Sequence, residues 1–201
     1  MEPSDMGEEG DPGAGFAYSY KPTLMGEALE FRLTPHALQW RISGRTGETP
    51  YEHMQRLRLS FRPTTLQTGR FMTEIWSSQG PKLVIASTSW RGLIDQERHD
   101  AAYTRFVSEL VRRIGLANSQ TTFEAGSVPV IYWAGLVVFV VACLGLAALM
   151  TKALASQAWT PALIVAGFLA IFLWQTGGYF RRNRPARFEP EAIPPEVLPR
   201  P

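Results

Sequence analysis

The chain has 201 residues, of which 45% are hydrophobic and 19% charged, and its formal net charge is only +2. This length allows one ordinary domain with attached segments, and the near balance of charge excludes the dense basic stripe of a nucleic-acid-binding protein. A single cysteine, Cys143, excludes an internal disulfide.

The first fifteen residues differ from the rest of the chain. They contain five acidic residues, no basic residue and several Gly and Pro. Such a segment has too little apolar surface to form a core, so we expect residues 1–15 to be a disordered acidic tail.

Two strand-like runs come next, at residues 28–33 and 36–42. Apolar and polar residues alternate in both runs, which is the pattern of a strand with one buried face. The Thr34-Pro35 pair between them favours a tight turn. The two runs therefore predict a hairpin, and residues 43–50, "SGRTGETP", predict a turn into the following strand.

That strand is expected within residues 49–63, "TPYEHMQRLRLSFRP". Two further strand candidates, residues 69–78 and 81–89, have no clean alternation that would assign their inner faces. Within residues 49–63, side chains are expected to alternate between the two faces of the strand. The apolar residues Leu57, Leu59 and Phe61 should then point inward, and Arg56, Arg58 and Arg62 should lie on the solvated face.

The period changes between residues 95 and 115. Apolar residues recur there at the i, i+3, i+4 and i+7 spacing of an amphipathic helix, with Asp95 as the expected cap and Gly115 as the expected stop. The residues on the apolar side of this helix are Tyr103, Phe106, Val107, Leu110, Val111 and Ile114. Residues 117–127 are then a linker.

Two uncharged segments follow, residues 128–150 and 159–180. About 20 residues at ~1.5 Å rise span the ~30 Å hydrocarbon core of a bilayer, so these segments predict two transmembrane helices. Residues 151–158 form the short periplasmic turn. The alternatives are buried helices of a soluble protein and a cleaved signal; the segment lengths argue against the first, and the acidic start of the chain argues against the second.

The flanks of these segments predict an orientation. Only Lys152 lies in the turn, whereas several arginines follow the second segment, so the positive-inside rule places the tail, residues 181–201, in the cytoplasm together with the amino-terminal domain. The residues expected at the membrane interface are Tyr132, Trp133, Trp159, Trp174, Tyr179, Arg181, Arg182 and Arg184.

Small residues recur every four positions in the second apolar segment, at Ala162, Ala166 and Ala170. Such a face lets a neighbouring helix approach closely, either the first segment or another chain. The proline-rich tail is expected to be extended, as a docking peptide or as an unstructured cytoplasmic segment.

The chain resembles bacterial membrane-anchored pleckstrin-homology-like (PH-like) proteins in three features. These are several strands closed by one amphipathic helix, the phrase "TPYEHMQRLRLSF", and "ASTSWRGL" before the helix. The resemblance covers residues 16–116. It implies an α+β fold, with an antiparallel PH-like sheet or barrel closed by one C-terminal amphipathic helix, followed here by the two-helix transmembrane hairpin. In many such bacterial proteins the hairpin precedes the domain. The resemblance implies an address in the bacterial inner membrane.

No pattern for catalysis or metal binding is found in the sequence. His36, His53 and His99 are scattered without ligand spacing, so we expect no enzyme, no metal and no cofactor. The expected function is a noncatalytic scaffold, accessory subunit or assembly factor with other integral membrane proteins as partners and no nucleic acid. The alternative is an anionic-lipid-sensing module, and the candidate contacts for either are Arg41, Arg56, Arg58 and Arg62.

Overall fold

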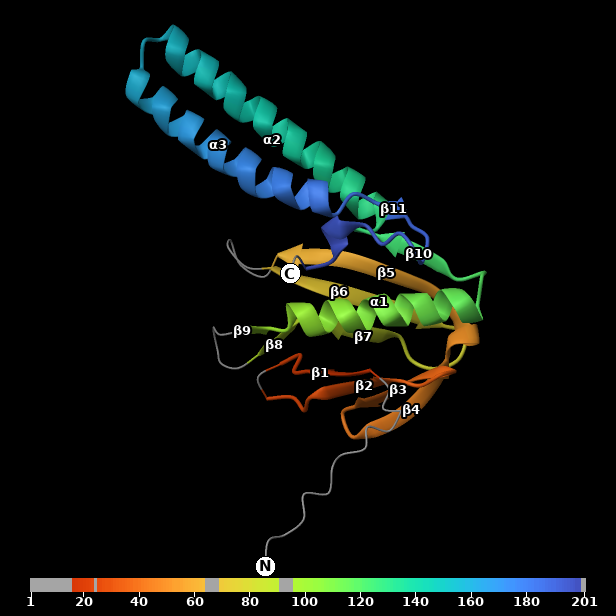
Figure 1. Cartoon of the computed structure of the whole chain (residues 1–201). Coiled ribbons are helices and arrows are strands. Elements are labelled where there is room, and N and C mark those ends of the chain that lie inside the picture. Colours follow the sequence, from red (N-terminus) through yellow and green to blue (C-terminus); the bar gives the residue numbers. More distant parts are fainter. Residues whose placement is uncertain (1–15, 24, 64–68, 91–95, 200–201) are drawn as a thin grey trace, which may run out of the picture.

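A computed structural model describes residues 16–23, 25–63, 69–90 and 96–199. It contains a β-rich N-terminal domain followed by two long apolar helices that could span a membrane. Figure 1 shows these helices as a hairpin that projects from one side of the domain. The expected acidic tail and the expected cap Asp95 lie outside the described residues.

The first sheet is an antiparallel meander of four neighbouring strands. The expected hairpin is present in it, with Leu33 opposite Leu38. The segment expected to be only a turn instead supplies a strand, because the chain reverses at Ser43 and Gly44, both of which have positive φ. The strands are β1 (Ala17–Tyr20), β2 (Leu29–Leu33), β3 (Ala37–Ile42) and β4 (Arg45–Pro50).

The second sheet has the order β11-β10-β5-β6-β7. A short 3-10 helix, η1 (Tyr51–His53), leads into it from β4, and a separate two-stranded sheet pairs β8 (Thr88–Trp90) with β9 (Gln96–Arg98). The strands of the second sheet are β5 (Met54–Pro63), β6 (Gly69–Ser77), β7 (Leu83–Ala86), β10 (Thr122–Ala125) and β11 (Ala186–Arg187).

Two parts of the expected fold are wrong. The second sheet is mixed, because β10 runs parallel to β5. Within the described ranges the sheets also do not close into a barrel. The first sheet instead reaches the free edge of β7 through side chains: the Tyr18 hydroxyl donates to the Ala86 carbonyl at 2.7 Å, and the Tyr20 hydroxyl to the Val84 carbonyl at 2.8 Å.

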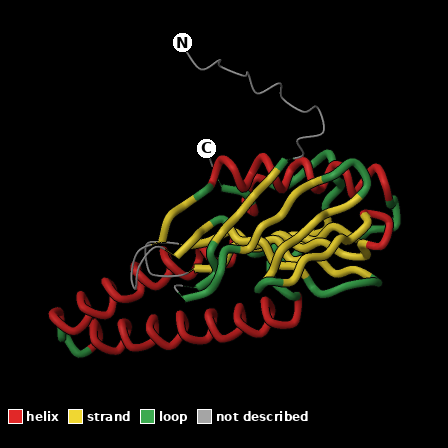
Figure 2. Tube along the Cα trace, turned by 90° about the horizontal axis from the view of Figure 1, so that it is seen from below, coloured by secondary structure: helices red, strands yellow, loops and turns green. Residues whose placement is uncertain are grey.

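Helix α1 (Asp100–Ala117) covers the core, as its periodicity predicts. All six residues of the expected apolar side are buried, with at most 2% of each exposed. The Tyr18 ring packs against Tyr103 and Phe106, so one core joins the helix to the first sheet. Figures 1 and 2 show α1 lying along one side of the strands. The helix does not stop at Gly115 but continues to Ala117.

Helices α2 (Pro129–Ala155) and α3 (Trp159–Arg182) form the hairpin, joined by a three-residue turn. At ~1.5 Å per residue, each is longer than the ~30 Å core of a bilayer. Aromatic rings connect the two helices, with centroids 5.2–5.5 Å apart. Tyr132 of α2 contacts Phe180 of α3, and Phe139 of α2 contacts both Phe172 and Phe180 of α3.

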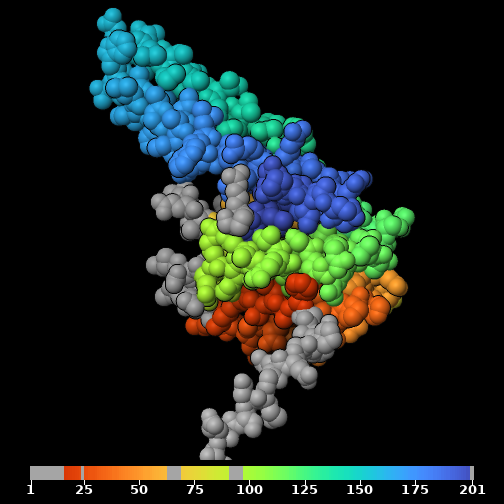
Figure 3. All heavy atoms as spheres, viewed as in Figure 1, coloured from red at the N-terminus to blue at the C-terminus, as the bar shows by residue number. Residues whose placement is uncertain are grey.

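The chain after the hairpin returns to the domain. It adds β11 to the second sheet and then a 3-10 helix, η2 (Pro195–Val197), whose Val197 is buried in the core. Phe188 and Ile193 pack against the same core. Figure 3 shows this segment in dark blue lying against α1 in green. Residues 183–199 therefore lie along the chain's own domain, where the sequence suggested a free extended tail.

Candidate functional site: the arginine face and the hairpin junction

The arginines of β5 lie on the face of the second sheet that points away from α1. Leu57 and Leu59 are fully buried on the opposite face, toward the core. Arg56, Arg58 and Arg62 therefore share one face, which we call the arginine face. Arg41 does not belong to it, because it lies on β3 of the other sheet, 3.2 Å from Glu30.

Arg58 is the most buried of these arginines, with 8% of the residue exposed. Its Nε donates to Glu124 Oε2 at 2.9 Å, and its Nη2 contacts the same oxygen. Glu124 lies directly beside Arg58 in the parallel pairing of β10 with β5. This ion pair fixes β10 to the sheet, so the Arg58 guanidinium is already used within the chain.

Arg56 lies against an aromatic ring. Its Cζ is 4.0 Å from the centre of the Trp76 ring, and Trp76 stands opposite Arg56 in the pairing of β5 with β6. Lys82 Nζ is 4.5 Å from the same ring and Arg58 Cζ is 5.4 Å from it. Three cations thus surround a half-buried indole, each within the ~6 Å at which the ring attracts a cation.

Arg62 is the arginine of this face with the most exposed side chain and, among the ion pairs of this face that the structure describes, the longest distance to its acidic partner. Its side chain is 53% exposed, and its Nη2 lies 3.7 Å from Glu74 Oε1. The same Glu74 oxygen accepts a shorter hydrogen bond of 2.6 Å from Lys82. Arg70 stands directly opposite Arg62 across the β5–β6 pair. Two guanidinium-bearing residues are therefore adjacent at the end of the hairpin strands.

Asn183 connects the end of α3 to the domain, a role that the sequence did not reveal. It is fully buried, its Oδ1 accepts from the Phe61 amide at 3.1 Å, and its Nδ2 donates to the Tyr179 carbonyl at 3.2 Å. Its own carbonyl accepts from the Ser127 amide at 3.0 Å. One side chain and its peptide thus join β5, α3 and the start of α2.

Gly126, between β10 and α2, completes this junction. Its φ of +81° is one that side chains rarely adopt, and a Cβ there would lie about 2.5 Å from the carbonyl oxygens of Asn183 and Arg184. Its amide donates to the Leu59 carbonyl at 2.7 Å. Both ends of the hairpin therefore enter the domain side by side, through main-chain contacts that only glycine permits at this position.

The other expected contact residues lie along the hairpin. Of the small residues, Ala162 is buried against α2, Ala166 is half-buried and Ala170 is exposed. Of the residues expected at a membrane interface, Tyr132 is buried and Tyr179 half-buried. The remainder are exposed: Trp133, Trp159, Trp174, Arg181, Arg182 and Arg184.

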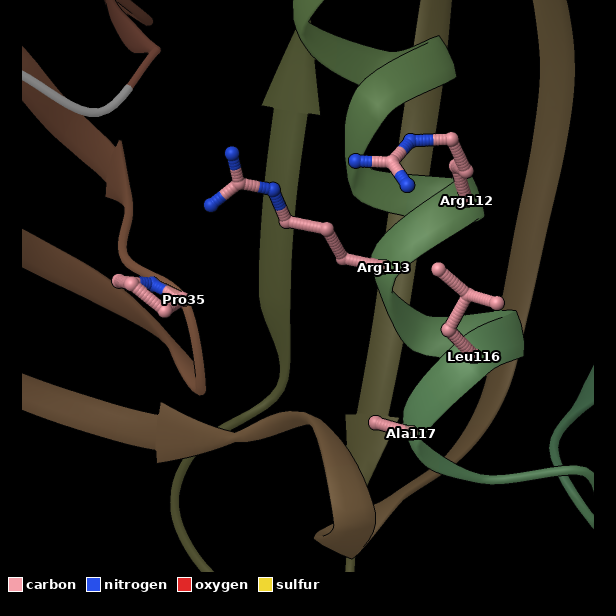
Figure 4. Close-up of a pocket in the computed structure, with 5 residues that line it drawn as sticks. All are labelled: Pro35, Arg112, Arg113, Leu116 and Ala117. Carbon is pink, nitrogen blue, oxygen red and sulfur yellow. The ribbon is translucent and has the colours of Figure 1, made fainter. Parts of the chain in front are cut away.

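A shallow hollow lies between α1 and the β2–β3 turn, lined by Pro35, Arg112, Arg113 and Leu116 among others. Figure 4 shows Arg113 extending from α1 toward Pro35. Both arginines bind Glu109, at 2.6 Å each, and Arg113 also donates to the Thr34 carbonyl at 2.7 Å. The hydrogen bonds from Arg112, and then those from Arg113, lower the pKa of Glu109 to about 2. Of the two arginines in this hollow, Arg113 therefore connects α1 to the β2–β3 turn, and Arg112, among the contacts of the described residues, binds only within α1.

Among the described residues no group of three or more His, Cys, Asp or Glu side chains could hold a metal ion. The arrangement offers charged and aromatic contact surfaces and a fixed junction with the hairpin. Comparison of the chain with known protein families, with curated proteins and with solved structures finds no match.

Proposed function

We propose that this protein is a noncatalytic, membrane-anchored interaction module. In this proposal the α2–α3 hairpin crosses the bacterial inner membrane, and the domain serves in the cytoplasm as a scaffold, accessory subunit or assembly factor of an integral membrane complex. The observation that carries it is that both ends of the hairpin continue into paired strands, β10 and β11, with Glu124 opposite Arg187.

This fixed connection between the hairpin and the domain favours a scaffold over a domain joined to the membrane by a flexible linker. A flexible linker would let the domain sample many orientations, but here the segment that follows α1 is hydrogen-bonded to the sheet. The Asn118 side chain donates to the carbonyls of Glu52 and Met54, and Thr121 Oγ1 donates to Met54 as well. A domain fixed in this way presents the same surfaces at a constant height above the bilayer.

The orientation is supported by the charges at the two ends of the hairpin. Arg181, Arg182 and Arg184 lie at the domain end, and Lys152 is the basic residue at the turn. The excess of arginine at the domain end favours a cytoplasmic domain.

We assign the domain to the PH-like kind on its order of elements. A four-stranded antiparallel meander, β1–β4, is followed by a three-stranded one, β5–β7, then by the paired strands β8 and β9, and then by α1. This order supports an interaction domain, although fold alone does not fix function.

The surface we assign to a protein partner is the part of the arginine face around Trp76. Tryptophan and arginine are the residue types most enriched where binding energy concentrates in interfaces. Arg56, Lys82 and Arg58 surround the indole, so the fitting partner presents an acidic segment to it.

The experiment is purification of the tagged full chain from native membranes in mild detergent. We expect a stoichiometric integral membrane partner that is lost from the Trp76→Ala and Arg56→Ala double variant. Arg105→Ala is the matched control, because Arg105 is an exposed arginine on α1 away from this face. Recovery of wild-type protein as a clean monomer would contradict the proposal.

A further inference from the structure

Like charges face one another at the end of the β5–β6 hairpin. Arg62 and Arg70 are direct partners in the antiparallel register and therefore point to the same face of the sheet. Two cations directly opposite each other destabilise a strand pair unless an anion lies between them. The acid nearest to Arg62 is Glu74 at 3.7 Å, which Lys82 already binds, and Arg70 makes no ion pair within the described part of the chain.

A third arginine reaches the same end of β5 from the hairpin. Arg182, the last residue of α3, holds its Cζ 4.9 Å from the ring of Phe61, which precedes Arg62. The Phe61 amide is in turn bound to Asn183. Figure 1 shows the end of β5 lying beside the base of the hairpin. Because the side chains of Phe61 and Arg62 alternate, Arg182 lies on the core side of this strand end, and Arg62 and Arg70 lie on the other face.

We propose that Arg62 and Arg70 bind the phosphate of an anionic phospholipid headgroup. The inference rests on the membrane placement of α2 and α3 proposed above. If α3 leaves the bilayer at its final arginines, headgroup phosphates lie at the level of this strand end. A guanidinium fork matches phosphate oxygens with two parallel hydrogen bonds, and each arginine near an anionic surface contributes about fivefold in affinity.

The position of this site differs from that expected for a lipid contact along the whole arginine face. Arg58 is bound by Glu124, and Arg56 lies over Trp76, six residues before Arg62 along β5 and farther from the hairpin junction. Lipid binding should therefore depend on Arg62 and Arg70 and not on Arg56.

The test is native mass spectrometry of the full chain, with phosphatidylglycerol or phosphatidylcholine added to the micelles. Wild-type protein should bind phosphatidylglycerol about 25-fold more tightly than phosphatidylcholine, which is the product expected from two arginines at about fivefold each. This preference should be lost from the double variant Arg62→Gln with Arg70→Gln, and it should persist in Arg56→Gln and in the control Arg105→Gln. Unchanged preference in the Arg62 and Arg70 double variant would overturn the proposal.

Three further arms identify the source of the phosphate and guard against misfolding. Glycerol 3-phosphate and inorganic phosphate are added as soluble competitors. If either one binds as tightly as the lipid does, the ligand of this site is a free phosphate and not a lipid headgroup. Arg62→Lys with Arg70→Lys keeps the charge and the fold but loses the fork, so it should bind with intermediate affinity. Alkaline extraction of membranes separates the two proposals: extracted protein contradicts the membrane anchor, whereas inserted protein without lipid preference contradicts only this inference.

Discussion

Gly115 lies so close to Pro190 that a Cβ built on the glycine would be 2.5 Å from Pro190 Cγ and 2.8 Å from Pro190 Cβ. Gly115 is inside the last turns of α1, and Pro190 follows β11 in the segment that returns from the hairpin. The glycine therefore makes a notch in the helix surface, and the returning segment occupies it.

Gly115→Ala should destabilise the protein even though alanine is the better helix former. The gain in helix propensity is about 0.5–1 kcal/mol, whereas overpacking of a tight contact costs about 1–3 kcal/mol. We expect a net loss of roughly 1 kcal/mol in the free energy of unfolding. Chemical denaturation of the full chain in mild detergent, followed by circular dichroism, measures it.

The control is the same substitution in a Pro190→Gly background, where the opposing ring is gone. There Gly115→Ala should stabilise α1, by about 0.5–1 kcal/mol. An equal effect of the alanine in both backgrounds would show that the returning segment does not lie against α1 in solution.

Asn183→Ala should loosen the connection between the hairpin and the domain. The variant leaves the buried Phe61 amide without its acceptor, and such a loss costs about 1–3 kcal/mol. Hydrogen exchange of the Phe61 amide should accelerate, while exchange in the middle of α1 changes less. Gln39→Ala is the control, because its hydrogen bond to Glu48 is exposed. Unaltered protection at Phe61 would argue against this junction.

The elements that the sequence predicted well are those with local periodicity. The apolar side of α1, the β2–β3 hairpin and the two long apolar helices each depend on residues close together in the chain. Period and length are sufficient for such elements, because their side-chain pattern and main-chain bonding involve the same segment.

The elements that the sequence missed are held by main-chain bonds between distant segments. β10 pairs with β5, more than 60 residues earlier, and β11 is separated from β10 by the whole hairpin. β4 is mostly polar and exposed, so it has no apolar alternation that could have indicated a strand. The expected helix stop at Gly115 was also wrong because of a contact between distant segments. The residue that requires a glycine there, Pro190, is distant in sequence.

The candidate site was predictable only in part. Period two correctly placed Arg56, Arg58 and Arg62 on one face of β5, but the groups that engage them come from other strands. Glu124 and Trp76 gave no signal in the sequence, because their roles arise from the register between strands. Sheet register likewise separates Arg41 from the other three.

Arg58→Met should be strongly destabilising, and Arg58→Met with Glu124→Met should recover most of the loss. Removing one partner of a fully buried ion pair costs about 3–5 kcal/mol, and less is expected here because the Glu124 side chain keeps 23% exposure. A double-mutant cycle on the free energy of unfolding measures the coupling. The exposed pair Arg41 and Glu30 is the control, with an expected coupling below about 1 kcal/mol. Equal couplings for the two pairs would mean that the Arg58 pair is not buried.

Acidification should weaken the attachment of α1 to the first sheet through Glu109. Hydrogen bonds from Arg112 and Arg113 lower its pKa from 4.5 to about 2 in the folded protein. The unfolded chain therefore takes up a proton on this residue at higher pH than the folded chain does. The stabilisation is complete above about pH 4.5 and is lost as the pH falls toward 2. Thermal unfolding midpoints measured across this range should fall more steeply for wild type than for Glu109→Gln, which has no carboxyl group to titrate at this position. Parallel curves for the two proteins would contradict a lowered pKa at Glu109.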